Sequence, residues 1–128
     1  ARETEGLALT PATVREGVLA ALRDEAKGRY FVAETDGVVV GQLLLTTEWS
    51  DWRNGPMWWI QSVYVAPDYR RGGVFRALYE HAVQEARALG VPAIRLYVEE
   101  HNTEAQAVYE RLGMKAAGYV VYDLEPVE

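Results

Sequence analysis

The hydrophobic and polar positions of the first fifty residues change from helix spacing to strand spacing. Thr10, a proline at residue 11 and apolar residues at three- and four-residue spacing predict an amphipathic helix over residues 11–27. Two β-rich runs, RYFVAE and VVVGQLLLTTE, flank Asp36 and Gly37, a pair typical of a two-residue hairpin turn. We therefore expect one helix followed by two antiparallel strands.

The rest of the chain repeats this change of spacing. The run PMWWIQSVYVA is apolar at nearly every position, which predicts a central strand buried on both faces. Apolar residues at four-residue spacing then predict a helix from residue 71 or 72 to 89, followed by a strand (AIRLYVE), a helix over 103–112 and a last strand (KAAGYVVYDL). This order favours an α/β domain, a mixed sheet with helices on both faces.

Composition excludes several classes of protein. A chain of 128 residues, 49% of them hydrophobic, is expected to fold as one domain over residues 1–128. No long apolar run or signal peptide is visible, so we expect a soluble, cytoplasmic protein with no membrane partner. The absence of cysteine removes disulfides and cysteine nucleophiles. The net charge of −6 argues against a nucleic-acid partner. His81 and His101 have no partners at ligand spacing, so no metal is predicted.

The run RRGGVF stands where the central strand gives way to the following helix. Unpaired N–H groups and the positive end of the dipole at a helix N-terminus bind phosphate, and glycines let an anion approach the backbone. Arg70 and Arg71 would add charge-assisted hydrogen bonds. Dinucleotide and P-loop motifs are both absent. The run therefore predicts a phosphate-bearing ligand of another kind, or else an ordinary helix start with surface arginines.

Two sequence blocks follow known motifs. The pattern V-x-P-x-x-[RQ]-x-x-G-x-[GA] is matched by Val65, Pro67, Arg70 and Gly73, with Phe75 in place of the usual small residue. The pattern N-x-x-A-x-x-x-Y-x-x-x-G-[FM] is matched by Asn102, Ala105, Tyr109, Gly113 and Met114. In these two blocks the chain resembles the GNAT N-acetyltransferase superfamily. The resemblance extends over about residues 7 to 124 in the order of elements.

The resemblance implies a mostly antiparallel mixed sheet whose two central parallel strands splay apart around acetyl-CoA. The pantetheine arm would bind backbone groups of Val63 and Val65, and the diphosphate would bind N–H groups of residues 71–76. The implied cofactor-binding residues are Val63, Tyr64, Val65, Arg70, Arg71, Gly72, Gly73, Val74, Phe75, Arg76 and Asn102. The family usually begins with one more strand and helix, whereas only ten residues precede Pro11. We expect either a shortened domain or missing residues, and an open sheet edge that can recruit a second copy as a homodimer.

The resemblance also implies direct attack of an amine on the thioester. The Val63 N–H would stabilise the oxyanion, and Tyr109 would protonate the departing sulfur, unless it is only a packed helix aromatic. Gln61 falls near a position where relatives hold a glutamate; it cannot act as a base but can orient the amine or a water. Glu48 or Asp51 would then take the proton, unless both are merely solvated charges.

Tryptophans and acids gather in one short segment, which suggests the acceptor. All four tryptophans fall within eleven positions, beside Glu48 and Asp51. Acidic and aromatic groups suit a small cationic amine, with Asp51 and Trp52 as substrate-binding residues. Trp58 and Trp59 fit a core or a dimer interface better. Protein or peptide N-termini stay open as acceptors, and a non-catalytic acyl-CoA sensor or a dimerising assembly module are the alternative functions.

Overall fold

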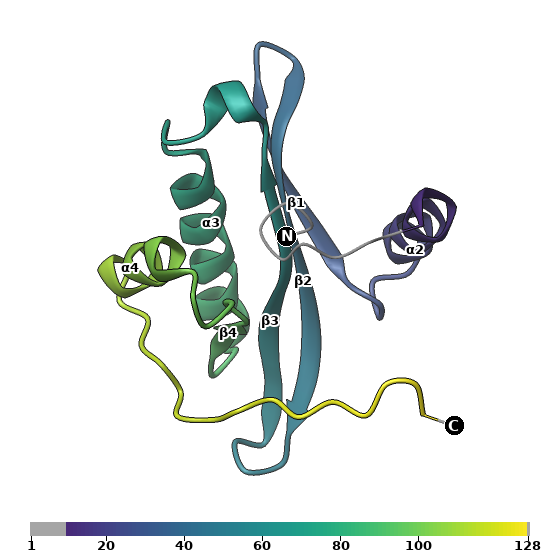
Figure 1. The fold of residues 1–128 in the computed structure, drawn as a ribbon, viewed down its shortest axis with the longest axis vertical. Helices are drawn as coiled ribbons and strands as arrows, with labels where there is room; N and C mark the ends of the chain where they lie inside the picture. The colour runs from purple at the N-terminus through teal and green to yellow at the C-terminus, as the bar shows by residue number, and fades with distance from the viewer. Residues whose placement is uncertain (1–9, 128) are drawn as a thin grey trace. The chain divides into compact units, whose positions relative to one another are not determined.

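The computed structural model describes residues 10–127, which divide between Tyr97 and Val98 into two compact units. The first unit contains helix α2 (Pro11–Arg23), strands β1 (Arg29–Thr35), β2 (Val38–Ser50) and β3 (Gly55–Val65), the short 3-10 helix η1 (Pro67–Tyr69), helix α3 (Val74–Leu89) and strand β4 (Ile94–Leu96) (Figure 1). The second unit contains helix α4 (Thr103–Arg111). The single-domain organisation stays a prediction.

The four strands form one sheet in the order β1-β2-β3-β4. The β1–β2 hairpin turns at Asp36 and Gly37, whose φ angles of 51° and 78° are those of a two-residue turn with both central residues left-handed, as predicted. β2 pairs antiparallel with β3, and β3 pairs parallel with β4. The expected α/β fold with a mixed, mostly antiparallel sheet is confirmed.

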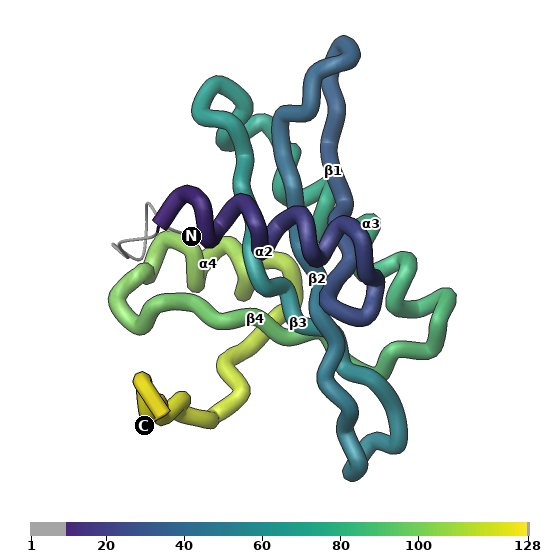
Figure 2. The backbone as a smooth tube through the Cα atoms, turned by 90° about the vertical axis from the view of Figure 1, so that its right-hand side faces the viewer, coloured from purple at the N-terminus to yellow at the C-terminus, as the bar shows by residue number. Residues whose placement is uncertain are grey.

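The core lies between α3 and one face of the sheet. Its buried residues are Leu78, Ala82 and Ala86 of α3 with Leu43, Leu45, Trp58 and Ile60 of the sheet. Trp58 is thus a core residue, one of the two roles expected for it. Figures 1 and 2 show α2 on the other side of the sheet from α3, so helices lie on both faces.

Helix α2 ends earlier than the spacing predicts, at Arg23 rather than residue 27. The Asp24 carboxylate accepts a hydrogen bond from the Ala26 N–H at 3.0 Å and pairs with Lys27 Nζ at 2.9 Å. These local bonds hold a turn in place of another helical turn. Two apolar side chains of the predicted amphipathic helix, Val14 and Val18, are exposed, with 42% and 38% of their surface accessible. None of the described helices is long and apolar enough to cross a membrane.

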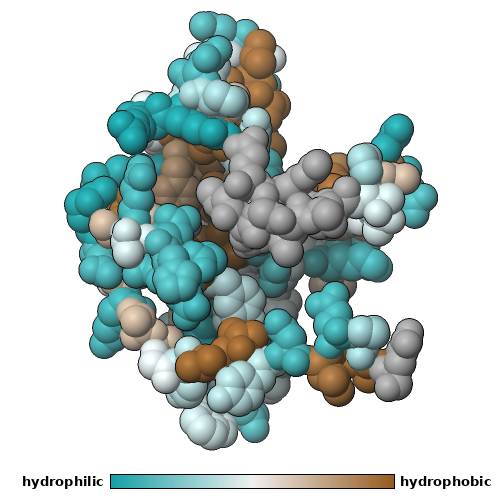
Figure 3. Space-filling view, viewed as in Figure 1, coloured by the Kyte–Doolittle hydropathy of each residue, from teal (hydrophilic) through white to brown (hydrophobic). Residues whose placement is uncertain are grey.

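Two predicted strands differ from the structure. The strand expected over residues 93–99 covers only Ile94–Leu96, and the last strand expected over 115–124 is irregular. Tyr119, Val120 and Tyr122 are exposed, and Figure 3 shows hydrophobic surface along this segment. β-rich composition indicates a segment suited to a sheet, but a strand forms only where a neighbouring strand supplies hydrogen bonds. The prediction of a last strand is therefore wrong for this structure.

Candidate functional site

The parallel pair of strands separates partway along β3. β4 pairs with β3 only from Trp58 to Ile60, whereas β3 continues to Val65 against β2. The Ala66 N–H donates to the Val40 carbonyl at 2.8 Å, so in a trans peptide the Val65 carbonyl points away from β2. By the two-residue repeat of a strand, the backbone groups of Val63 and Val65 face the open side. β4 ends at Leu96, so among the described residues no strand pairs with this part of β3 on that side, as the predicted splay requires.

A tight turn leads from the open end of β3 into α3. The Tyr69, Arg70 and Gly72 N–H groups bond to the carbonyls of Ala66, Pro67 and Tyr69 at 2.8, 3.3 and 3.3 Å. Arg71 and Gly73 have left-handed φ angles of 66° and 86°, which is why α3 begins at Val74 and not at residue 71 or 72 as predicted.

The start of α3 has the features of an anion site. Its first bond that closes a helical turn runs from the Ala77 N–H to the Gly73 carbonyl at 3.0 Å. The N–H groups of residues 74–76 therefore come before the first intrahelical donor, at the positive end of the helix dipole. Such an end binds phosphate groups.

Three side chains around the turn, those of Arg70, Arg76 and Phe75, make different contacts. Arg70 Nε donates to the Val65 carbonyl at 2.9 Å, and its guanidinium carbon lies 5.6 Å from the centre of the Tyr64 ring. Arg76 Nε pairs with Glu80 one helical turn further along, at 2.8 Å. Phe75 is half-buried, with its ring 6.1 Å from that of Tyr79. The Phe75 ring thus packs against Tyr79 along α3.

An aromatic cluster lies on the sheet beside the splay. The Trp59 indole N–H donates to Glu48 Oε1 at 3.1 Å, and the Trp59 ring lies 4.6 Å from that of Tyr97. The Arg95 guanidinium lies 6.0 Å from the Trp59 ring. The sequence pattern pointed to Glu48 but not to Tyr97. The parallel register of AIRLYVE against the WW pair could have identified Tyr97. That register sets Arg95 opposite Trp59, and Tyr97 follows two residues later on the same side of the chain.

Gln61, Asp51 and Trp52 occupy different parts of the β2–β3 hairpin. Gln61 is exposed and lies at a bulge, since Leu44 pairs with Ser62 and Leu45 with Ile60. Asp51 and Trp52 are at the hairpin tip, where Asp51 Oδ1 accepts from the Trp52 N–H at 2.9 Å and Trp52 is 87% exposed. At about 3.3 Å per residue, the tip end of β3 at Gly55 is about 20 Å from Gln61. The structure therefore does not bring the hairpin tip and Gln61 together.

The second unit holds the residues of the second block. Asn102 is the N-cap of α4, and its Oδ1 accepts from the Ala105 N–H at 3.1 Å. The Tyr109 carbonyl accepts from the Met114 N–H at 3.1 Å, and burial raises the pKa of Tyr109 above its ordinary value of 10.0. A tyrosine phenol is already protonated at neutral pH, so the raised pKa means only that Tyr109 holds this proton more tightly.

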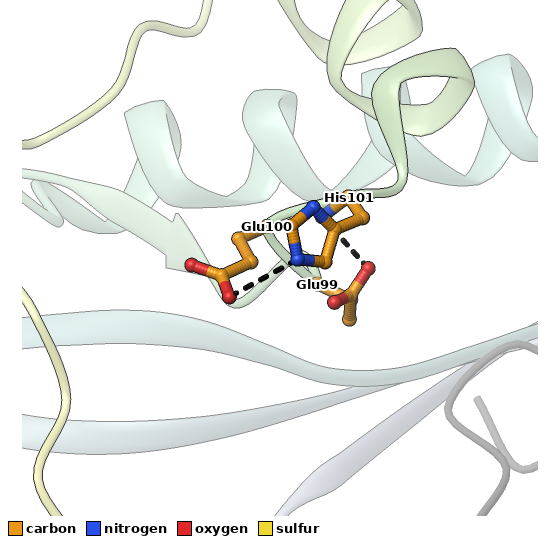
Figure 4. A group of neighbouring side chains, drawn as sticks. All are labelled: Glu99, Glu100 and His101. Carbon is orange, nitrogen blue, oxygen red and sulfur yellow. Dashed lines mark hydrogen bonds and ion pairs between the residues drawn. The ribbon is translucent and has the colours of Figure 1, made fainter.

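Three side chains at the start of the second unit lie close together (Figure 4). Glu99, Glu100 and His101 each offer one potential ligand atom, all within 4.8 Å of one another. Glu99 bonds to the His101 N–H at 2.8 Å, and Glu100 lies 3.3 Å from His101 Nε2. All three are exposed, and exposed acids often gather without a metal. The sequence pattern gave no sign of this cluster.

Residues 3–114 match the model of the Acetyltransferase (GNAT) family. A possible acetyltransferase from Clostridium difficile 630 has a solved structure 43% identical to this chain, with a TM-score of 0.91 over 100% of this chain and 85% of that one. The [Ribosomal protein bS18]-alanine N-acetyltransferase of Escherichia coli (strain K12) is 43% identical over 56 residues, or 44% of this chain. The mycothiol acetyltransferase of Streptomyces coelicolor is 34% identical over 84 residues, or 66% of this chain. The matches span only 38% and 26% of these two curated relatives.

Proposed function

Because the chain belongs to the GNAT family of acetyltransferases, we propose that it transfers an acetyl group from acetyl-CoA to a primary amine. One observation carries the proposal: the open edge of β3 at Val63 and Val65 runs directly into the turn and the N-terminus of α3. A strand edge that offers amide hydrogen bonds and ends at an anion site fits a ligand with an amide-containing arm and a diphosphate.

Acetyl-CoA would supply the acetyl thioester. The Val63 N–H would donate to the thioester oxygen as negative charge develops there, while the amine nitrogen bonds to the carbonyl carbon and the carbon–sulfur bond breaks. Tyr109 would give its proton to the departing sulfur. Glu48 pairs with Met57, four residues or about 13 Å along β3 from Gln61, so it would receive the ammonium proton through a chain of several waters. Gln61 would orient the amine or the water nearest to it.

A small cationic amine is the first acceptor that we propose. Glu48 is exposed, and the Trp59 indole N–H bonds to one of its oxygens, so the carboxylate is held at a fixed place on the sheet. The Trp59 and Tyr97 rings beside it add aromatic surface. A carboxylate with adjacent rings attracts a cation through charge and cation–π contacts.

A peptide N-terminus is the second acceptor, favoured by the position of the hairpin tip. If Asp51 and Trp52 bind the same acceptor as Gln61, that acceptor must span about 20 Å, the length of six extended residues. A small amine cannot contact both places. The double variant Asp51→Asn with Trp52→Ala distinguishes the two acceptors. It should lower kcat/KM for a peptide acceptor and leave kcat/KM for a small amine unchanged.

The function is tested by titrating acetyl-CoA calorimetrically and then following release of the CoA thiol with polyamines, aminoglycosides and short peptides. Micromolar binding, together with thiol release that an amine accelerates, supports an acetyltransferase. Binding with slow release that no amine accelerates supports a non-catalytic acyl-CoA sensor instead. No binding would contradict both. The homodimer stays a prediction, which sedimentation at several concentrations of the chain would test.

A further inference from the structure

The peptide unit between Val65 and Ala66 is held on both sides. Its N–H donates to the Val40 carbonyl at 2.8 Å, and its carbonyl accepts from Arg70 Nε at 2.9 Å. This is the last peptide of β3, and its carbonyl lies on the edge that β4 leaves open. The orientation of the open backbone groups therefore depends on a side-chain bond in place of a neighbouring strand.

Arg70 is itself fixed at two further points. Its backbone N–H donates to the Pro67 carbonyl at 3.3 Å, and its guanidinium carbon lies 5.6 Å from the centre of the Tyr64 ring. Tyr64 belongs to the same strand end, so one side chain ties β3 to the turn that follows. A planar guanidinium can stack on an aromatic ring while its Nε donates a hydrogen bond to a nearby carbonyl.

We propose that Arg70 is a positioning residue that orients the Val65 peptide and the turn. It supports ligand binding mainly by holding the Val65 carbonyl in place, and less by placing its positive charge against a phosphate. The sequence pattern predicts the opposite, a direct contact between Arg70 and a phosphate. This role of Arg70 deepens the proposed function. It depends on that function only in the experiment that measures acetyl-CoA binding.

Side-chain chemistry offers a direct test. Nε is the fourth side-chain atom of arginine, and the amide nitrogen of glutamine occupies the same place in its chain. Arg70→Gln therefore keeps a neutral donor at that position and loses the charge. Lysine has a carbon there, so Arg70→Lys keeps the charge and loses both the donor and the planar group. The same two substitutions at Arg87, an exposed residue in the last turn of α3, are the matched controls.

The first measurement uses the chain without ligand. Amide hydrogen exchange is followed by NMR at Tyr69, Arg70 and Gly72, whose N–H groups close the turn. Arg70→Lys should raise these exchange rates about three- to tenfold, the effect of losing one net hydrogen bond, while Arg70→Gln stays near wild type. Unchanged rates in Arg70→Lys, with wild-type unfolding, would overturn the proposal.

The second measurement is the dissociation constant of acetyl-CoA at low and high salt. Arg70→Lys should bind about three- to tenfold more weakly, and Arg70→Gln within about threefold of wild type. The reverse order, with a loss in Arg70→Gln that shrinks at high salt, would show a phosphate contact and overturn the proposal. If the wild-type chain does not bind acetyl-CoA, the proposed function fails, and the exchange rates alone decide the role of Arg70.

Discussion

Gly41 lies so close to Val74 that a β-carbon on Gly41 would stand 2.7 Å from Val74 Cγ1. Gly41 pairs with Val65 at the end of β3, and Val74 is the first residue of α3. The absence of a side chain at Gly41 thus lets the start of α3 approach the sheet. This single contact links the open strand edge to the proposed anion site.

Gly41→Ala should destabilise the protein by about 1–3 kcal/mol, because valine is stiff and the helix start must move. Acetyl-CoA should also bind more weakly. The control is Gly17→Ala in α2, where a β-carbon meets nothing within 4 Å and should stabilise by about 0.5–1 kcal/mol. Urea unfolding of both variants measures the difference, and an equally stable Gly41→Ala would refute the close approach.

Glu48→Gln should lower kcat about 100-fold at neutral pH, because the amide cannot take a proton. Glutamine still offers an oxygen to the Trp59 indole N–H, so folding and tryptophan fluorescence should stay as in the wild type. Steady-state kinetics with a small amine provide the measurement. Asp51→Asn is the comparison, and a larger loss there would identify Asp51 as the base.

Tyr109→Phe should lower kcat about 100-fold with little change in the dissociation constant of acetyl-CoA, since only the proton donor is lost. Pre-steady-state and steady-state thiol release would separate the chemical step from product release. Turnover equal to that of the wild type would leave Tyr109 as a packed helix aromatic.

The raised pKa of Tyr109 predicts a pH dependence of stability. Above the ordinary tyrosine pKa of 10.0 the unfolded chain loses this proton, while the folded chain keeps it until pH reaches the higher folded pKa. The contribution is therefore complete below pH 10 and is lost as pH rises through the folded pKa. The free energy of unfolding should fall more steeply in the wild type than in Tyr109→Phe from pH 10 upward. Parallel curves would contradict the shift.

Asn102 combines a structural role with the predicted cofactor contact, and two substitutions separate them. Asn102→Ala should cost about 1 kcal/mol, because the Ala105 N–H loses its cap. Asn102→Asp keeps an oxygen for that N–H but loses the amide donor. Thermal unfolding reports the cap, and acetyl-CoA affinity reports the contact. If Asn102→Asp binds acetyl-CoA as the wild type does, the cofactor role is wrong.

The sequence by itself determined the elements whose signals are local. Asp36 and Gly37 adopt the left-handed angles of their turn, Asn102 caps α4, and α3 ends at a left-handed Gly90, because each feature depends on residues within one turn. The helix-start glycines and the strand before them likewise predict an anion site at the start of α3, which stays a prediction. These are interactions over a few residues, which a pattern can encode.

Only the tertiary structure decided which groups meet. The point where β4 leaves β3, the bulge at Gln61 and the pairing of Trp59 with Tyr97 depend on strand register, which a hydrophobic pattern specifies only to the correct face. The bond from Arg70 to the Val65 carbonyl depends on the path of the turn between them, and a motif letter gives no direction to a side chain. The irregular segment over 115–124 has the composition of a strand, yet hydrogen bonding to a neighbour is a property of the fold and not of that segment.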